Sequence, residues 1–91
     1  MVTVIVFHFT EKGLLPTKLS EEAYRSLRTE IDKVLEDPKY KDVYFNGTFV
    51  DENGKGVCLW NAPNAEIVKE VIEEVLGCPP VDGAIEVKQV I

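Results

Sequence analysis

Residues 43–62 constrain the fold most, because two apolar, alternating runs flank Asn53-Gly54 there. Both central residues of a type I′ turn need a positive φ, and the Asn-Gly pair meets that need. The segment therefore predicts a β-hairpin with a two-residue turn, in which Glu52 faces Lys55. This register pairs Phe49 with Cys58, Gly47 with Trp60 and Phe45 with Ala62 on one face, and Val50 with Val57, Thr48 with Leu59 and Asn46 with Asn61 on the other.

The remaining elements surround this hairpin. Residues 2–9 are β-branched and aromatic on both faces, which is typical of a central strand. After a predicted loop at 11–18, Ser20 is the expected N-cap of an amphipathic helix over 21–36. Asn64 and Gly77 bound a second helix over 65–76, and 84–91 form a closing strand. The order predicts one ferredoxin-like α+β domain over 1–91: a four-stranded antiparallel sheet of order 4-1-3-2 with two helices on one face.

The alternation of side chains assigns each strand residue to a face of this sheet. Toward the helices we expect Ile5, Phe7, Phe9, Phe45, Phe49, Cys58, Trp60, Ile85 and Val87. On the open face we expect an apolar patch of Val4, Val6, Val50, Val57, Leu59 and Val90. Exposed apolar patches of this kind mark interfaces, so the sequence predicts a homodimer through the open face of the sheet.

Polar residues gather at the other end of the same predicted face. Pairing of the first and last strands is expected to place His8 beside Glu86. We expect the strand that ends at Asn61 to be the parallel neighbour of the first strand and Asn46 to be its hairpin partner, so Asn61 and Asn46 continue the row, with Tyr44 beyond it. A carboxylate next to an imidazole orients it, and amides and a phenol add hydrogen-bonding groups. We therefore predict a site for a small polar ligand, or one edge of a metal site with His8 as a ligand.

Charge and segment lengths exclude other classes of partner. Sixteen acidic against ten basic side chains give a net charge of -6, whereas nucleic-acid binding needs a basic surface. Residues 2–9 are too short to span a bilayer, and no basic segment precedes them, so we expect a cytoplasmic protein without membrane contact. Cys58 and Cys78 have no zinc-site spacing. They are either free thiols, with Cys58 buried, or partners in a disulfide.

The C-terminal part, residues 56–91, resembles a small domain family of unknown function. Members carry a Cys-x-(Tyr/Trp)-x-Ala-Pro motif, a helix, a Gly-x-Pro break and a closing (Ile/Val)-x-Glu-Val. Some members are described as nickel-binding proteins with a ferredoxin-like fold and a tendency to dimerise, so the resemblance implies nickel as a possible cofactor. The second strand departs from the family's His-Ser-Tyr-Val-like sequence and has no histidine. The matching residues are Cys58, Trp60, Ala62, Pro63, Gly77, Pro79, Glu86 and Val87.

Three functions are compatible with this sequence. The first is a dimeric binding module for a small polar ligand or metal around His8. The second is an enzyme similar to the dimeric α+β-barrel proteins, which include monooxygenases and isomerases, with His8 as general base. The third is a structural or assembly module that binds no ligand.

Overall fold

The structure of the protein is a computed structural model that describes residues 1–9 and 21–91. The predicted cap Ser20 and the predicted loop at 11–18 lie outside these residues. The elements are β1 (Val2–His8), α1 (Glu21–Leu35), the short 3₁₀ helix η1 (Pro38–Tyr40), β2 (Tyr44–Val50), β3 (Gly56–Ala62), α2 (Ala65–Leu76) and β4 (Ala84–Val87).

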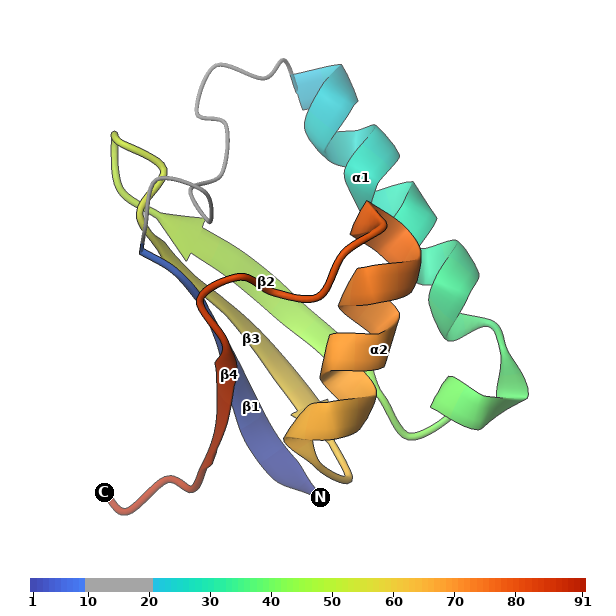
Figure 1. Ribbon diagram of the computed structural model, residues 1–91, viewed down its shortest axis with the longest axis vertical. Coiled ribbons are helices and arrows are strands. Elements are labelled where there is room, and N and C mark those ends of the chain that lie inside the picture. Colours follow the sequence, from blue (N-terminus) through green and yellow to red (C-terminus); the bar gives the residue numbers. More distant parts are fainter. Residues whose placement is uncertain (10–20) are drawn as a thin grey trace.

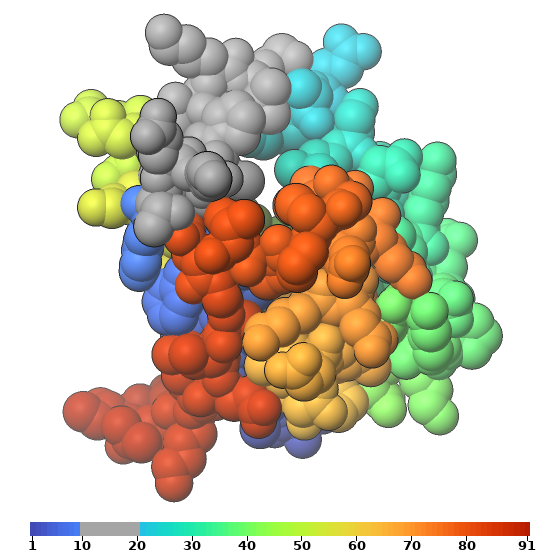
Figure 2. Space-filling view, in the orientation of Figure 1, coloured from blue at the N-terminus to red at the C-terminus, as the bar shows by residue number. Residues whose placement is uncertain are grey.

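The strands form one antiparallel sheet of order β2-β3-β1-β4, and both helices lie on the same side of it (Figure 1). This is the predicted order read from the opposite edge, so the predicted α+β topology is confirmed. β4 is shorter than predicted, since it ends at Val87, and the residues after it project from the body of the molecule (Figure 2). Within the described ranges, neither helix has the length and the apolar run that crossing a membrane requires.

Helix α2 begins and ends where the sequence predicts. Asn64 has an extended backbone and its Oδ1 accepts a hydrogen bond from the backbone N–H of Ile67 at 3.0 Å. Gly77 follows the helix with φ +81°, the left-handed conformation in which a glycine avoids the steric cost of a Cβ. The carboxylate of Glu86 on β4 accepts from the backbone N–H of Ala65, so α2 receives a second side-chain partner at its N-terminus.

The hairpin between β2 and β3 has a longer loop than predicted. Gly54 has φ +83°, whereas no described residue other than glycine has a positive φ, so the two-residue type I′ turn is wrong. The carboxylate of Asp51 accepts from the backbone N–H groups of Asn53 and Lys55 at 2.8 and 3.0 Å. This carboxylate organises a loop over 51–55 and thereby moves the strand pairing by one residue, so that Thr48 lies opposite Cys58.

A β-bulge changes the register of β2 a second time. The pairing of β2 with β3 shifts between Phe45 and Gly47, so Phe45 lies opposite Trp60 and Gly47 opposite Leu59. Asn46 is the additional residue of β2 at this point. Because one residue is inserted, Phe45 and Thr48 face the same side of the sheet, which is the helix side.

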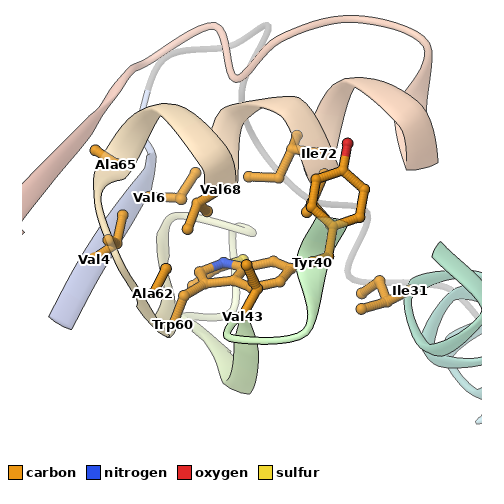
Figure 3. Close-up of a cluster of buried hydrophobic side chains, with 12 residues drawn as sticks. Val4, Val6, Ile31, Tyr40, Val43, Trp60, Ala62, Ala65, Val68 and Ile72 are labelled. Atoms are coloured by element: carbon orange, nitrogen blue, oxygen red, sulfur yellow. The ribbon is translucent and has the colours of Figure 1, made fainter. Parts of the chain in front are cut away.

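The core lies between the sheet and the helices, around the indole of Trp60 (Figure 3). Val4 and Val6 of β1 are fully buried on this side, so the predicted phase of the first strand is wrong. Val4 lies opposite Trp60 in the register, and both side chains belong to the buried core. Tyr40 of η1, 1% exposed, is a core residue that the sequence pattern did not reveal.

The open face of the sheet, the one away from both helices, has a different composition from the predicted one. Of the predicted patch, Val57 and Leu59 lie there, Val4, Val6 and Val50 face the helices instead, and Val90 lies beyond β4. Phe49 and Ile85 are 58% and 46% exposed, so the face presents apolar area to solvent. The register assigns to the open face the apolar residues Ile5, Phe7, Phe49, Val57, Leu59, Ile85 and Val87.

Candidate functional site

The predicted polar row around His8 does not form. β1 runs antiparallel to β3, so His8 lies opposite Gly56 whereas Asn61 lies opposite Thr3, at the other end of the strand pair. Glu86 lies opposite Val4 and not beside His8. Because β1 and β3 are antiparallel, and because the even-numbered residues of β1 face the helices, the structure contradicts the prediction of one site from these residues.

Three of the predicted residues do lie near one another on the open face. Tyr44 is opposite Asn61, and the amide nitrogen of Asn46 donates to the amide oxygen of Asn61. The Asn61 amide nitrogen in turn donates to the Thr3 hydroxyl at 3.4 Å. The two amides therefore bond to each other and to a neighbouring strand, and no charged side chain from the four strands joins them.

His8 belongs to a different group, which faces the helices. Its Nε2 lies 2.9 Å from Sγ of Cys58, and the Thr48 Oγ1 lies 3.0 Å from the same sulfur. The three side chains come from the adjacent strands β1, β3 and β2, which hold them at fixed positions across the sheet. We refer to His8, Cys58 and Thr48 as the thiol cluster. His8 and Cys58 are each 9% exposed.

Burial controls the protonation of the thiol. Removal of the sulfur from water raises the pKa of Cys58, because burial disfavours the thiolate, and the hydrogen bond with Thr48 lowers it by a smaller amount. The sulfur is therefore a neutral thiol at neutral pH. In the tautomer with hydrogen on Nδ1, Nε2 of His8 accepts from this thiol.

The thiol cluster lies at one end of a cavity between the sheet and the two helices, with a volume of about 410 Å³. The exposed lining residues, which form the rim of the cavity, are Tyr24 and Arg28 of α1, Leu76 at the end of α2, and Thr48 and Val50 of β2. The remaining walls are mainly apolar. They include Leu27 and Ile31 of α1, Phe45 and Trp60 of the sheet, and Ile72 and Val75 of α2.

Two further polar groups belong to the lining residues. Nε1 of Trp60 is buried without a hydrogen-bond acceptor among residues 1–9 and 21–91. At the rim, the Arg28 guanidinium lies 5.0 Å from the centroid of the Phe45 ring, and its Nε donates to the Asp32 carboxylate at 3.2 Å. Arg28 is thus held over the aromatic edge of the opening by a cation–π contact and an ion pair.

Metal ligation through His8 stays a prediction. Within the described ranges, no group of three His, Cys, Asp or Glu side chains is placed to hold a metal ion. His8 and Cys58 together supply two donors, which is fewer than a closed tetrahedral site requires. Both cysteines are free thiols, Cys58 buried and Cys78 exposed, which agrees with the first of the two alternatives for this pair.

Cys58 and Thr48 were missing from the predicted site, although the sequence contained a signal for Cys58. A hairpin between two parallel crossovers forces β3 to run antiparallel to β1. With that direction, a buried Cys58 and a buried His8 fall on one face of neighbouring strands. Thr48 carried no comparable signal, because its orientation depends on the length of the hairpin loop.

The element order, the antiparallel sheet and the placement of both helices on one side define a small α+β protein with a cavity between its two layers. No protein-family model and no curated protein matches the sequence, so the resemblance to the small domain family stays a prediction. The crystal structure of SCO4226 from Streptomyces coelicolor A3(2) is similar, with a TM-score of 0.70 over 98% of this chain and 99% of that chain. At 20% sequence identity, this similarity shows the fold alone.

Proposed function

We propose that this chain is a ferredoxin-like binding protein for a small, mainly apolar molecule that carries one neutral polar group. The observation that supports this proposal is the cavity of about 410 Å³, whose walls are mainly apolar and which has the thiol cluster at one end. Small-molecule sites commonly have this composition and a volume of roughly 300–1,000 Å³. The proposal moves the ligand from the open face of the sheet, where the sequence suggested it, to the helix side.

The chemistry of the polar end favours a ketone or an alcohol over an ion. The Thr48 hydroxyl can both donate and accept a hydrogen bond, and the Cys58 thiol is held neutral by burial. Among the described lining residues, Arg28 carries the one fixed charge, and it is exposed at the rim and paired with Asp32. An anionic group buried near the thiol cluster would therefore lose its hydration without a permanently charged cation beside it.

A titration with isopropylcyclohexanone, substituted on the ring carbon opposite the ketone, tests the proposal. The compound has an apolar body and one carbonyl acceptor. Followed by amide NMR, its binding is expected to shift the signals of Ile31, Cys58 and Val75, which surround the cavity. Shifts confined to residues of the open face, such as Ile5 and Ile85, or no shifts at all, would contradict the proposal.

Two variants that each introduce a phenylalanine test where the ligand binds. Val75 lines the cavity from α2, and a phenylalanine there fills space that the ligand needs. Val81→Phe introduces the same side chain at a position that is 57% exposed and outside the cavity. We expect the first variant to lose the ligand-induced shifts and the second to keep them. Equal binding by both variants would place the ligand elsewhere.

We also propose a homodimer formed through the open face. That face carries seven apolar side chains and no charged residue from any strand, so two copies can meet there without bringing like charges together. Sedimentation of Ile85→Glu should show dissociation to monomers, whereas Val81→Glu, which changes an exposed residue outside the sheet, should leave the dimer intact. A wild-type monomer at all concentrations would exclude the dimer.

A further inference from the structure

The thiol cluster contains a feature that ligand binding alone does not use. A cysteine that only fills space in a core needs apolar neighbours, yet the Cys58 sulfur has an imidazole nitrogen at 2.9 Å and a hydroxyl at 3.0 Å. All three groups line the cavity, so a bound molecule can reach the sulfur. A thiol with an adjacent nitrogen base is the arrangement that makes a sulfur nucleophile.

We propose that Cys58 adds to small, apolar α,β-unsaturated ketones bound in the cavity, with His8 as the base that accepts the thiol proton. The inference rests on the proposed function, because the cavity must first bind the ketone. Cys58 is the nucleophile that becomes modified, His8 is the base, and Thr48 positions the sulfur through its hydrogen bond.

The step balances within the site. The S–H bond breaks as its proton moves to Nε2 of His8, and the sulfur electron pair forms a bond to the β-carbon of the enone. The π electrons of the C=C bond move toward the carbonyl oxygen and give an enolate. The imidazolium then returns the proton to the α-carbon, so one S–C and one C–H bond replace the S–H bond and the C=C π bond. No oxidant, reductant or second substrate takes part.

Two observations favour enones over other electrophiles. Because Cys58 is a neutral thiol and not a thiolate, the reaction requires an electrophile that is held against the sulfur while His8 removes the proton. The mainly apolar cavity concentrates a hydrocarbon ring next to the sulfur, which raises the effective concentration of the reacting carbon. A polar electrophile that stays hydrated is neither held against the sulfur nor concentrated in the cavity.

Cys78 offers an internal comparison, since it is a free thiol exposed to solvent. The protein is incubated with isopropylcyclohexenone, the unsaturated counterpart of the ketone above, and the adducts are located by peptide mass spectrometry. We expect Cys58 to react at least about tenfold faster than Cys78 despite its burial. Iodoacetamide, a small polar electrophile, should instead modify Cys78 first. Faster reaction of the enone at Cys78, or preference of both reagents for Cys58, would overturn the proposal.

His8→Gln tests the base, because glutamine keeps a polar group at this position but cannot take the proton. The rate of adduct formation at Cys58 should fall about 100-fold, the loss typical of a missing general base, while the rate at Cys78 is unchanged. Val75→Phe should slow Cys58 by excluding the enone, so the test does not depend on the folding of one variant. An unchanged rate in either variant, once folded as judged by its amide spectrum, would overturn the proposal.

The saturated ketone separates the two proposals. If isopropylcyclohexanone shifts the cavity signals but the enone leaves Cys58 unmodified, the covalent step is wrong and the binding function stands. If the ketone does not bind in the cavity, both proposals fail together.

Discussion

Replacement of Trp60 by phenylalanine is expected to change the free energy of unfolding far less than replacement by alanine. The indole is 2% exposed, and its ring centroid lies 4.8 Å from that of Phe45. Trp60→Ala removes nearly all of this packing and leaves a void in the centre of the core. A loss of about 3–5 kcal/mol is expected for such a truncation.

Two opposing effects decide the outcome of Trp60→Phe. The change removes two buried carbon atoms, and at ~0.8 kcal/mol for each buried methylene this costs roughly 1.6 kcal/mol. It also removes the buried Nε1–H group, which has no acceptor among the described residues. An unsatisfied buried donor destabilises the folded state by roughly 1–3 kcal/mol. The two effects nearly cancel, so the net change should lie within about 1 kcal/mol of zero.

Urea denaturation followed by far-ultraviolet circular dichroism measures these differences, since the variants lack the tryptophan that fluorescence would report. Tyr44→Phe, on the open face and 52% exposed, is a control in which the change should stay within about 0.5 kcal/mol. A loss above about 2 kcal/mol for Trp60→Phe would show that Nε1 has a hydrogen-bond acceptor in solution, and would refute the cancellation.

Three further predictions concern the thiol, α2 and the hairpin. The pKa of Cys58 is raised in the folded state, so the unfolded chain loses its thiol proton first as pH rises, and the free energy of unfolding should fall above about pH 9.0. Denaturation at each pH should show that this decrease is absent in Cys58→Ala. Glu86→Ala should cost about 1 kcal/mol, through loss of the acceptor and charge at the N-terminus of α2, and Glu86→Gln, which keeps an acceptor oxygen, should cost less. Equal losses would show that the hydrogen-bond acceptor contributes nothing by itself. A Cβ on Gly56 would lie 1.9 Å from a backbone carbonyl oxygen, so Gly56→Ala should lower the free energy of unfolding by about 3 kcal/mol or more. A Cβ on Gly77 would have no neighbouring atom within 4 Å, so Gly77→Ala should cost only the strain of its backbone conformation, about 1–2 kcal/mol. If Gly77→Ala unfolded at a lower temperature than Gly56→Ala, the register of β2 with β3 would be contradicted.

The order of strands and helices could be predicted from the sequence because local signals mark its elements. Asn64 and Gly77 bound α2 where they were expected, and Pro38 disfavours a continuation of α1, which ends at Leu35. Each of these signals acts within one turn of backbone, so no knowledge of distant packing is needed. The sheet order then follows from the alternation of strands and helices.

The orientation of β1 could not be predicted from its own sequence. Val4 and Val6 on one face and Ile5 and Phe7 on the other are all apolar, so alternation gives no preference for either side. Packing against Trp60, far along the chain, decides that the valines lie inside. The same decision places His8 toward the helices, and this explains why the predicted site was assembled on the wrong face.

The hairpin loop shows a second reason why part of the fold could not be predicted from the sequence. Asn53-Gly54 correctly indicates a hairpin, but the carboxylate of Asp51 competes for the same backbone N–H groups and stabilises a longer loop. One residue of difference in the loop exchanges the neighbours of every side chain on β2. Thr48 thereby lies opposite Cys58, whereas the predicted two-residue turn had placed Phe49 opposite Cys58.

The additional residue at Asn46 has a consequence for how the chemistry of this fold can vary. Deleting that single residue would leave a regular ladder in which Phe45 still lies opposite Trp60 and Thr48 still lies opposite Cys58. The amide contact of Asn46 with Asn61 on the open face would be lost, whereas the packing over the indole and the group that touches the thiol would stay. At this position the open face of β2 can therefore change, even in chain length, without a change on the side that faces the helices.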